Sequence, residues 1–141
     1  MKTRMLALIG LVAALAVAGV ATAGGSTKLA AQLRGANERP AAPASNRGSV
    51  EVTLKAGKVC WEFTIAKIDG KPNAAHIHKG RPGVAGPVFI PLGTTFKRQG
   101  CAPAKASQLK ALRAHPGAFY VNVHNAKHLA GAMRGQLRVH A

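Results

Sequence analysis

Three histidines stand at positions where their side chains could bind a transition-metal ion. His76 and His78 flank Ile77, and His124 lies in a second run in which polar and apolar residues alternate. Residues two apart in a β-strand project from the same face, so the imidazoles of His76 and His78 stand side by side while Ile77 faces the core. If the strands of His76 and His124 are neighbours, three imidazoles converge on one outer face. Because neutral imidazole is a common ligand of zinc and copper, the spacing predicts a copper or zinc site.

Two further polar residues belong to the same expected binding surface. Asn122 shares its face with His124, two residues away, and Arg134 lies in the last alternating run of the chain. A structural alternative needs no metal, because paired histidines on a strand can also hydrogen-bond a neighbouring loop. The glycine-rich segment 79–87 follows His78 directly and is such a loop. Both interpretations stay open at this point.

Residues suited to side-chain catalysis are few. The chain has four acidic residues, and no two of them are spaced as a general acid and base of one site: Glu38, Glu51, Glu62 and Asp69. No serine stands in the Gly-x-Ser-x-Gly turn of a hydrolase. The remaining histidines are expected at a helix end, in a loop and near the C-terminus: His115, His128 and His140. The sequence leaves enzymatic activity open and favours a non-enzymatic protein.

Short runs with a period of two must position these side chains, and such runs predict β-strands with one buried face. The expected strands are residues 28–33, 50–55, 59–65, 75–78, 88–92, 119–124 and 133–139. One short helix is expected within residues 105–114, ended by a His-Pro-Gly sequence. This pattern predicts an all-β fold, an antiparallel Greek-key β-sandwich or barrel.

The N-terminal segment has the layout of a secretory signal peptide. Lys2 and Arg4 precede an apolar run at residues 5–20, which is followed by the small residues Ala-Thr-Ala. We expect residues 1–23 to be the signal peptide and residues 24–141 to form a single domain in a secreted or periplasmic protein. The domain contains no second apolar run long enough to cross a bilayer.

The only two cysteines are Cys60 and Cys101, and both lie in the exported part. An oxidising compartment is expected to join them, although two independent thiols remain the alternative. A disulfide that closes a loop of about 40 residues contributes roughly 3–4 kcal/mol in the chain-entropy interpretation.

The chain is strongly basic. Removal of Lys2 and Arg4 with the signal peptide lowers the formal net charge from +16 to +14. A field of this size attracts polyanions such as cell-wall polymers, phospholipid head groups or acidic polysaccharides. Nucleic acid is disfavoured, because the protein is expected outside the cytoplasm and has only six aromatic residues to stack on bases. General basicity of an organism's exported proteins would explain the charge equally well.

Three ordered motifs resemble the CHRD domain, the module named after chordin. They are residues 33–40, 75–92 and 120–137, so the resemblance spans about residues 29 to 139. Three positions depart from the family pattern: Asn125 replaces the usual Thr, Leu129 the usual Pro, and Ala132 the usual Glu. The last change leaves Arg134 without the carboxylate expected beside it.

The resemblance implies a small exported member of the bacterial type, a group without an assigned activity. Its extracellular ligand is unknown, and the chordin partners, growth factors, do not transfer to such a chain. Immunoglobulin-like and Cu/Zn superoxide dismutase-like sandwiches are the two arrangements that fit, although analogy of fold carries no function. The leading hypothesis is a binding module whose surface is built by His76, His78, Asn122, His124 and Arg134. The alternatives are a copper or zinc protein with redox activity, and attachment to an anionic cell-surface polymer.

Overall fold

The structure of this protein is a computed structural model that describes residues 25–140. These residues form nine strands and one α-helix, with two 3-10 turns between them. The elements are β1 (Thr27–Arg34), η1 (Gly35–Asn37), β2 (Arg47–Lys55), β3 (Lys58–Lys67), β4 (Pro72–Lys79), β5 (Val88–Pro91), β6 (Gln99–Pro103), α1 (Ala106–Ala114), η2 (Pro116–Ala118), β7 (Phe119–Asn125), β8 (Met133–Gln136) and β9 (Arg138–Val139). The expected signal peptide, residues 1–23, lies outside the described residues.

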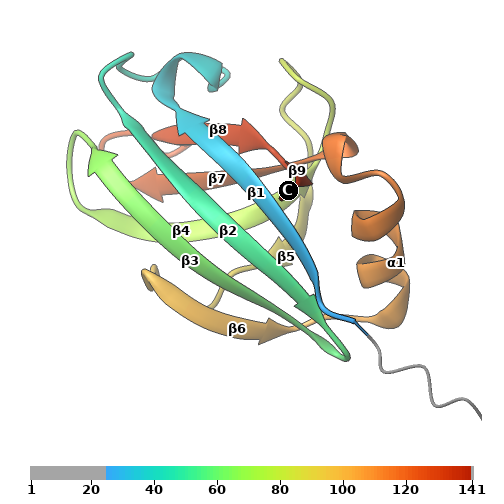
Figure 1. The fold of residues 1–141 in the computed structure, drawn as a ribbon. Helices are drawn as coiled ribbons and strands as arrows, with labels where there is room; N and C mark the ends of the chain where they lie inside the picture. The colour runs from blue at the N-terminus through green and yellow to red at the C-terminus, as the bar shows by residue number, and fades with distance from the viewer. Residues whose placement is uncertain (1–24, 141) are drawn as a thin grey trace, which may run out of the picture.

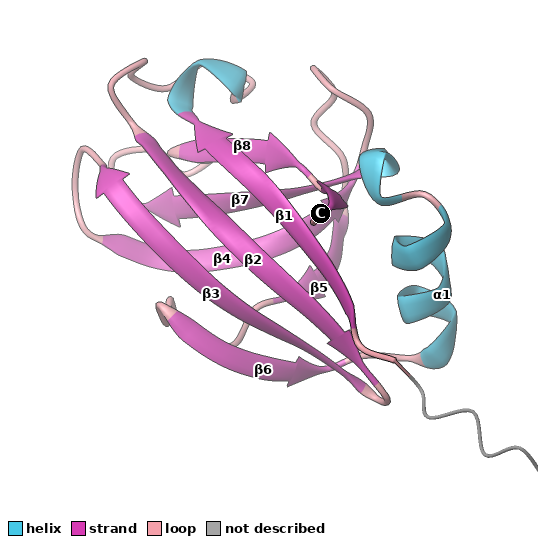
Figure 2. Ribbon diagram, in the orientation of Figure 1, coloured by secondary structure: helices cyan, strands magenta, loops and turns pink. Residues whose placement is uncertain are grey.

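All strand pairs are antiparallel, and eight strands follow one another in the order β5-β4-β7-β8-β1-β2-β3-β6. The short β9 pairs with β1 outside this order. The sheet curls into a nearly closed barrel, with β1, β2 and β3 in the near layer and β4, β7 and β8 behind them (Figure 1). The α-helix lies beside one end of the barrel (Figure 2). The predicted all-β, antiparallel fold with a single short helix is therefore confirmed.

The alternating residues meet across neighbouring strands and fill the barrel. In the hairpin of β2 and β3, three directly opposite pairs are buried: Val50 with Phe63, Val52 with Trp61, and Leu54 with Val59. Ile77 of β4 and Val121 of β7 form another buried pair. Burial of a large apolar side chain contributes about 1.5–3 kcal/mol, so this core sets the register of the sheet.

The helix seals one end of the core. Leu109 and Leu112 are its buried residues, as their spacing of three predicts. The side chain of Gln108 accepts a hydrogen bond from the backbone N–H of Lys105 at 2.8 Å and donates one to the carbonyl of Phe89 at 2.8 Å. The first turn of the helix is thereby tied to β5.

Residues 99–103 form the strand β6, which the sequence pattern did not predict. Ala102 is the only buried side chain of β6, so the apolar alternation is missing. Backbone pairing with β3 and a disulfide hold the strand instead: Cys60 and Cys101 are directly opposite each other and joined by an S–S bond of 2.07 Å. Gly100 allows the strand to pass close to the ring of Trp61, since a Cβ there would lie 2.8 Å from it. The predicted disulfide is confirmed.

The run 133–139, predicted as one strand, is divided into β8 and β9. Leu137 interrupts it, because its backbone N–H bonds to the carbonyl of Phe119 on β7 at 2.9 Å while β9 pairs with β1. Among residues 25–140, no helix is long and apolar enough to span a membrane. The disulfide fits an extracellular protein.

Candidate functional site

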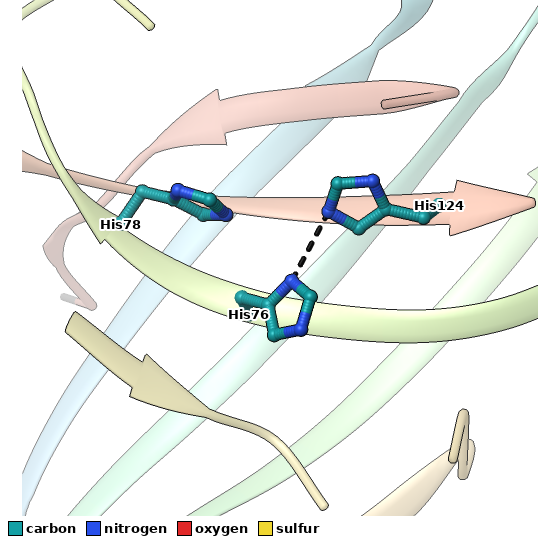
Figure 3. Close-up of side chains that lie close together, drawn as sticks. All are labelled: His76, His78 and His124. Atoms are coloured by element: carbon teal, nitrogen blue, oxygen red, sulfur yellow. Dashed lines mark hydrogen bonds between the residues drawn. The ribbon is translucent and has the colours of Figure 1, made fainter. Parts of the chain in front are cut away.

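Pairing of β4 with β7 brings the three predicted histidines together. In this ladder His76 faces Asn122 and Ala74 faces His124, so all these side chains share one face of the sheet. His76 Nδ1 lies 3.1 Å from His124 Nε2. One nitrogen from each of His76, His78 and His124 lies within 4.8 Å of the other two. Figure 3 shows the three rings directed toward a common point.

Backbone carbonyls determine which nitrogen of two rings carries the proton. His78 Nδ1 donates to the carbonyl of Gly86 at 2.8 Å, and His124 Nδ1 donates to the carbonyl of Leu129 at 2.9 Å. A carbonyl oxygen accepts only, so Nε2 of both rings carries a lone pair and no hydrogen. The lone pair of His124 Nε2 accepts a hydrogen bond from His76 Nδ1 at 3.1 Å. His78 Nε2 is buried and has no hydrogen-bond partner. Loop anchoring therefore uses Nδ1 of these rings, while Nε2 is the atom that could bind a metal ion.

Burial keeps the three imidazoles neutral at pH 7. It lowers the pKa of His76 to about 4, with repulsion from His124 and His78 adding to the effect. Burial also lowers the pKa of His78 and of His124, and the Arg134 guanidinium adds to both shifts. A neutral ring with a free lone pair is the form that binds a metal ion.

Tyr120 packs against the histidine cluster. Its ring is stacked on the ring of His78, with centroids 5.0 Å apart and an interplanar angle of 6°. The Tyr120 hydroxyl accepts a hydrogen bond from the Gly86 N–H at 3.0 Å, next to the carbonyl that holds His78. The guanidinium of Arg134 lies 4.3 Å from the centroid of the tyrosine ring on β7. This stack fixes both the ring of His78 and the loop that covers it.

A buried ion pair lies behind Tyr120. Arg134 Nε donates to Glu38 Oε2 at 2.6 Å, and the two side chains are 4% and 0% exposed. Arg134 Nη1 also donates to the carbonyl of Val84 at 3.0 Å. Burial raises the pKa of Glu38, while the adjacent guanidinium of Arg134 opposes the rise. Gly131 adopts φ +141°, and a Cβ at this position would lie 2.4 Å from the Glu38 carboxylate.

Comparison with protein families gives a match that spans nearly all of the described chain. A family model described as the CHRD domain matches residues 29–137 of the 141-residue chain. The chain belongs to the CHRD-domain family. No curated protein and no solved structure matches it. The resemblance inferred from the three motifs is thus confirmed, and CHRD membership, like the disulfide, fits an extracellular protein.

Glu38 is a supporting residue of the candidate site that sequence reasoning missed. We expected Arg134 to lack a carboxylate because Ala132 occupies the position of the family's usual acid, and this expectation was wrong. Glu38 supplies the carboxylate from 96 residues away in the sequence. Two features of the sequence could have pointed to Glu38: it lies in the opening motif, and it is one of only four acids. Its contact with Arg134 was not predictable, because that contact depends on the pairing of β1 with β8.

The histidine face of the CHRD domain is more covered than the strand pattern predicted. Tyr120, Asn122 and Arg134 are each at most 3% exposed, and His78 is 8% exposed. The loop between β4 and β5 and the segment after β1 lie over this face, since Val84, Gly86 and Glu38 all bond to it. Asn122 and Arg134 therefore support the cluster, while His76 and His124 stay partly exposed.

The other histidines lie outside the cluster, as predicted. His115 is the C-terminal cap of α1. His128 Nε2 lies 3.5 Å from Asp69 Oδ2 in a loop, and His140 Nδ1 lies 3.9 Å from Glu51 Oε1 near the C-terminus.

The metal-free domain is expected to lose stability as the pH falls from about 7 to 4. The ordinary pKa of histidine is 6.5, whereas that of folded His76 is about 4, so between these values the unfolded chain binds more protons. The free energy of unfolding therefore decreases through this window and levels off below it. His76 is partly exposed, and after allowance for solvent screening we expect its share to be roughly 1–2 kcal/mol. Urea unfolding at several pH values measures it, and equal slopes in the wild type and in His76→Asn would contradict it.

Tyr120→Phe is expected to lower the free energy of unfolding by about 1–2 kcal/mol. The variant keeps the stacked ring but removes the hydroxyl, which leaves the Gly86 N–H without its acceptor. Chemical denaturation at pH 7 measures the change. An unchanged midpoint would show that the hydroxyl does not hold the loop.

Proposed function

We propose that this CHRD domain is an exported metal-binding module in which His76, His78 and His124 hold a copper or zinc ion. One observation carries the proposal: two of the three rings bond to carbonyls through Nδ1 and direct their Nε2 lone pairs into the cluster. Ligating histidines in metalloproteins usually donate their second ring N–H to a carbonyl or carboxylate in this manner, which fixes the tautomer.

The energetics of the metal-free cluster support the same function. His78 Nε2 is buried without a partner, and an unsatisfied buried polar atom costs about 1–3 kcal/mol. A metal ion would accept this lone pair together with those of His76 and His124. Loop anchoring requires only Nδ1 of His78 and of His124, and the bond from His76 Nδ1 to His124 Nε2 links those two rings. Neither interaction gives His78 Nε2 a partner, whereas a metal ion would.

The donor set favours borderline transition metals. It consists of three imidazole nitrogens, without a thiolate or a carboxylate among the converging atoms. Imidazole suits copper and zinc, whereas calcium and magnesium prefer oxygen ligands. Bound copper would supply one-electron chemistry and bound zinc a Lewis acid, while the chain's own residues hold the rings neutral and oriented.

Export is part of the proposal and rests on the signal-peptide pattern at residues 1–23 and on the Cys60–Cys101 disulfide. An exported metal site of this kind would meet metal ions outside the cytoplasm. The extracellular ligand of the leading sequence hypothesis is then the metal ion itself.

A metal titration of the protein exported from its full-length chain, without a histidine tag, tests the function. After dialysis against a chelator, Zn²⁺ and Cu²⁺ are added separately and the bound metal is counted by elemental analysis and native mass spectrometry. We expect one ion per chain at micromolar supply. His124→Asn should lose it, because asparagine can keep the bond to the Leu129 carbonyl but provides no Nε2.

His115→Asn is the matched control, since this histidine lies at the end of α1 and outside the cluster. It should retain the ion. Absence of stoichiometric metal from the wild type, or equal loss in the two variants, would refute metal binding at the cluster.

A further inference from the structure

We propose that the outer face of β1, β2 and β3 carries a second, separate site that binds a tetrahedral oxyanion, the phosphate or sulfate ester of an anionic polymer. Its charged residues are Arg34 and Arg47, and its neutral donors are Gln32, Ser49 and Thr64. In the sheet order, β8 lies between β7, which carries His124, and β1, the first strand of this site. The hollow shares no residue with the histidine cluster, so the site does not depend on the proposed metal function.

Strand register places these side chains together. Arg34 on β1 is directly opposite Arg47 on β2. Two residues along the strands, Gln32 on β1 is opposite Ser49 on β2, and Ser49 is also opposite Thr64 on β3. Directly opposite residues of antiparallel strands project from the same face, with Cβ atoms about 4.5–5.5 Å apart. Two guanidinium groups thus lie beside a row of one amide and two hydroxyl groups.

The surface is hollowed at this place. A cavity of about 170 Å³ is lined by Gln32, Arg34, Arg47, Ser49, Thr64 and Ala66. Each water molecule in liquid occupies about 30 Å³, so the hollow holds several waters and has room for an oxyanion. Leu33, Gly48 and Ala66 complete its lining, and the side chains of Gln32, Arg34, Arg47 and Thr64 are exposed at its rim.

The positive charges of the hollow have no ion-pair partner in the part of the chain that the structure describes. Lys67 on β3 pairs with Arg47 from the other side of β2, where the register shifts between Arg47 and Gly48. Three cations therefore follow one another across three strands, and the two arginines line the hollow. Within residues 25–140, no carboxylate oxygen lies within 4.0 Å of the charged nitrogens of these three side chains. Glu51, the nearest acid along β2, is four residues from Arg47, roughly 13 Å along the strand.

Like charges directly opposite each other destabilise a sheet, so this row opposes folding unless an anion lies between the side chains. A guanidinium binds phosphate or sulfate through two parallel N–H bonds, and two of them surround a tetrahedral oxyanion. The adjacent hydroxyl and amide groups can bond the hydroxyl groups that flank such an ester on a polyol or sugar chain. A carboxylate has only two oxygens, enough for one guanidinium, whereas a phosphate or sulfate ester has further oxygens for the second, so we assign the site to phosphorylated or sulfated polymers.

Paired variants with equal change of net charge test the site in the full, disulfide-bonded protein. Arg34→Gln/Arg47→Gln removes the two guanidinium groups of the hollow. Lys55→Gln/Lys58→Gln removes two exposed cations that face each other at the opposite end of the same hairpin. The first probes are inorganic phosphate and sulfate, and the second are poly(glycerol phosphate) and dextran sulfate. All are added at about 0.15 M salt, which screens long-range attraction.

We expect backbone NMR shifts on addition of phosphate or sulfate to centre on Gln32, Ser49 and Thr64. The arginine pair variant should bind the polymer about tenfold more weakly, whereas the lysine pair variant should change less than twofold. Preference for poly(glycerol phosphate) or for dextran sulfate identifies the source of the ester, and either preference supports the site. The melting temperature of the arginine pair variant should stay level or rise, since removal of like charges relieves repulsion.

Three results would overturn the proposal. They are binding of neither oxyanion nor polymer by the wild type, equal weakening in the two pair variants, and shifts centred away from the hollow. Equal weakening would assign any polymer binding to the net charge of the whole chain.

Discussion

His78→Asn is expected to lower the affinity of the domain for Zn²⁺ or Cu²⁺ by more than about 100-fold, because substitution of an outer-shell residue alone typically costs 10–100-fold. Asparagine can place its amide N–H where Nδ1 donates to the Gly86 carbonyl, so the loop stays anchored. The variant has no counterpart of Nε2, the buried and unpartnered atom of the cluster. Competition with a chelating dye measures the affinity.

His78→Gln is the complementary variant. Glutamine is longer and places its polar end near the position of Nε2, while it gives up the bond to Gly86. If the histidine serves the metal, the asparagine variant loses affinity with a free energy of unfolding within about 1 kcal/mol of the wild type. A fully retained affinity in His78→Asn, together with unfolding of His78→Gln, would leave loop anchoring as the only role of this residue.

Glu38→Gln is expected to lower the free energy of unfolding by about 3–5 kcal/mol. The substitution leaves the Arg134 guanidinium buried without an anion, and its remaining side-chain bond to the protein is the one to the Val84 carbonyl. Loss of this charge balance also loosens the guanidinium above Tyr120, whose ring supports His78. Urea denaturation followed by the fluorescence of the single tryptophan, Trp61, measures the effect.

The double variant Glu38→Gln/Arg134→Met distinguishes the cost of an unpaired charge from the loss of packing. Removal of both charges should recover a large part of the stability lost in Glu38→Gln alone, because a buried pair contributes little beyond a hydrophobic replacement. Asp69→Asn is the surface control. It breaks an exposed ion pair with Lys127 and should have a much smaller effect. Equal stability of the single and double variants would argue against the unpaired charge as the cause.

The support behind the histidines links the three CHRD motifs of this chain. The opening motif contains Glu38, the central motif contains His76, His78 and Gly86, and the closing motif contains His124 and Arg134. Each motif contributes one part of a single layer in which the ion pair holds the tyrosine ring, the ring holds His78, and His78 holds the loop. In this chain the three motifs thus meet in one continuous network.

Local patterns determined most of the strands and the pairing of the histidines. Alternation in β2, β3 and β4 follows from burial of one face, which is a property of each short segment and its period of two. β7 has the same alternation of residue types, although both of its faces are buried. The same period placed His76 and His78 on one face. The family motifs and the disulfide could also be predicted from the sequence. A motif consists of residues close together in the chain, and the disulfide follows from the presence of only two cysteines.

Tertiary structure alone decided the strand β6, the burial of the histidine face and the partner of Arg134. β6 lacks alternation and is held by contacts with β3, while the loop that covers His78 is placed by hydrogen bonds to residues far along the chain. Glu38 meets Arg134 across 96 positions because β1 pairs with β8. Such contacts leave no periodic trace in the sequence, because they depend on which strands become neighbours when the whole sheet closes around one core.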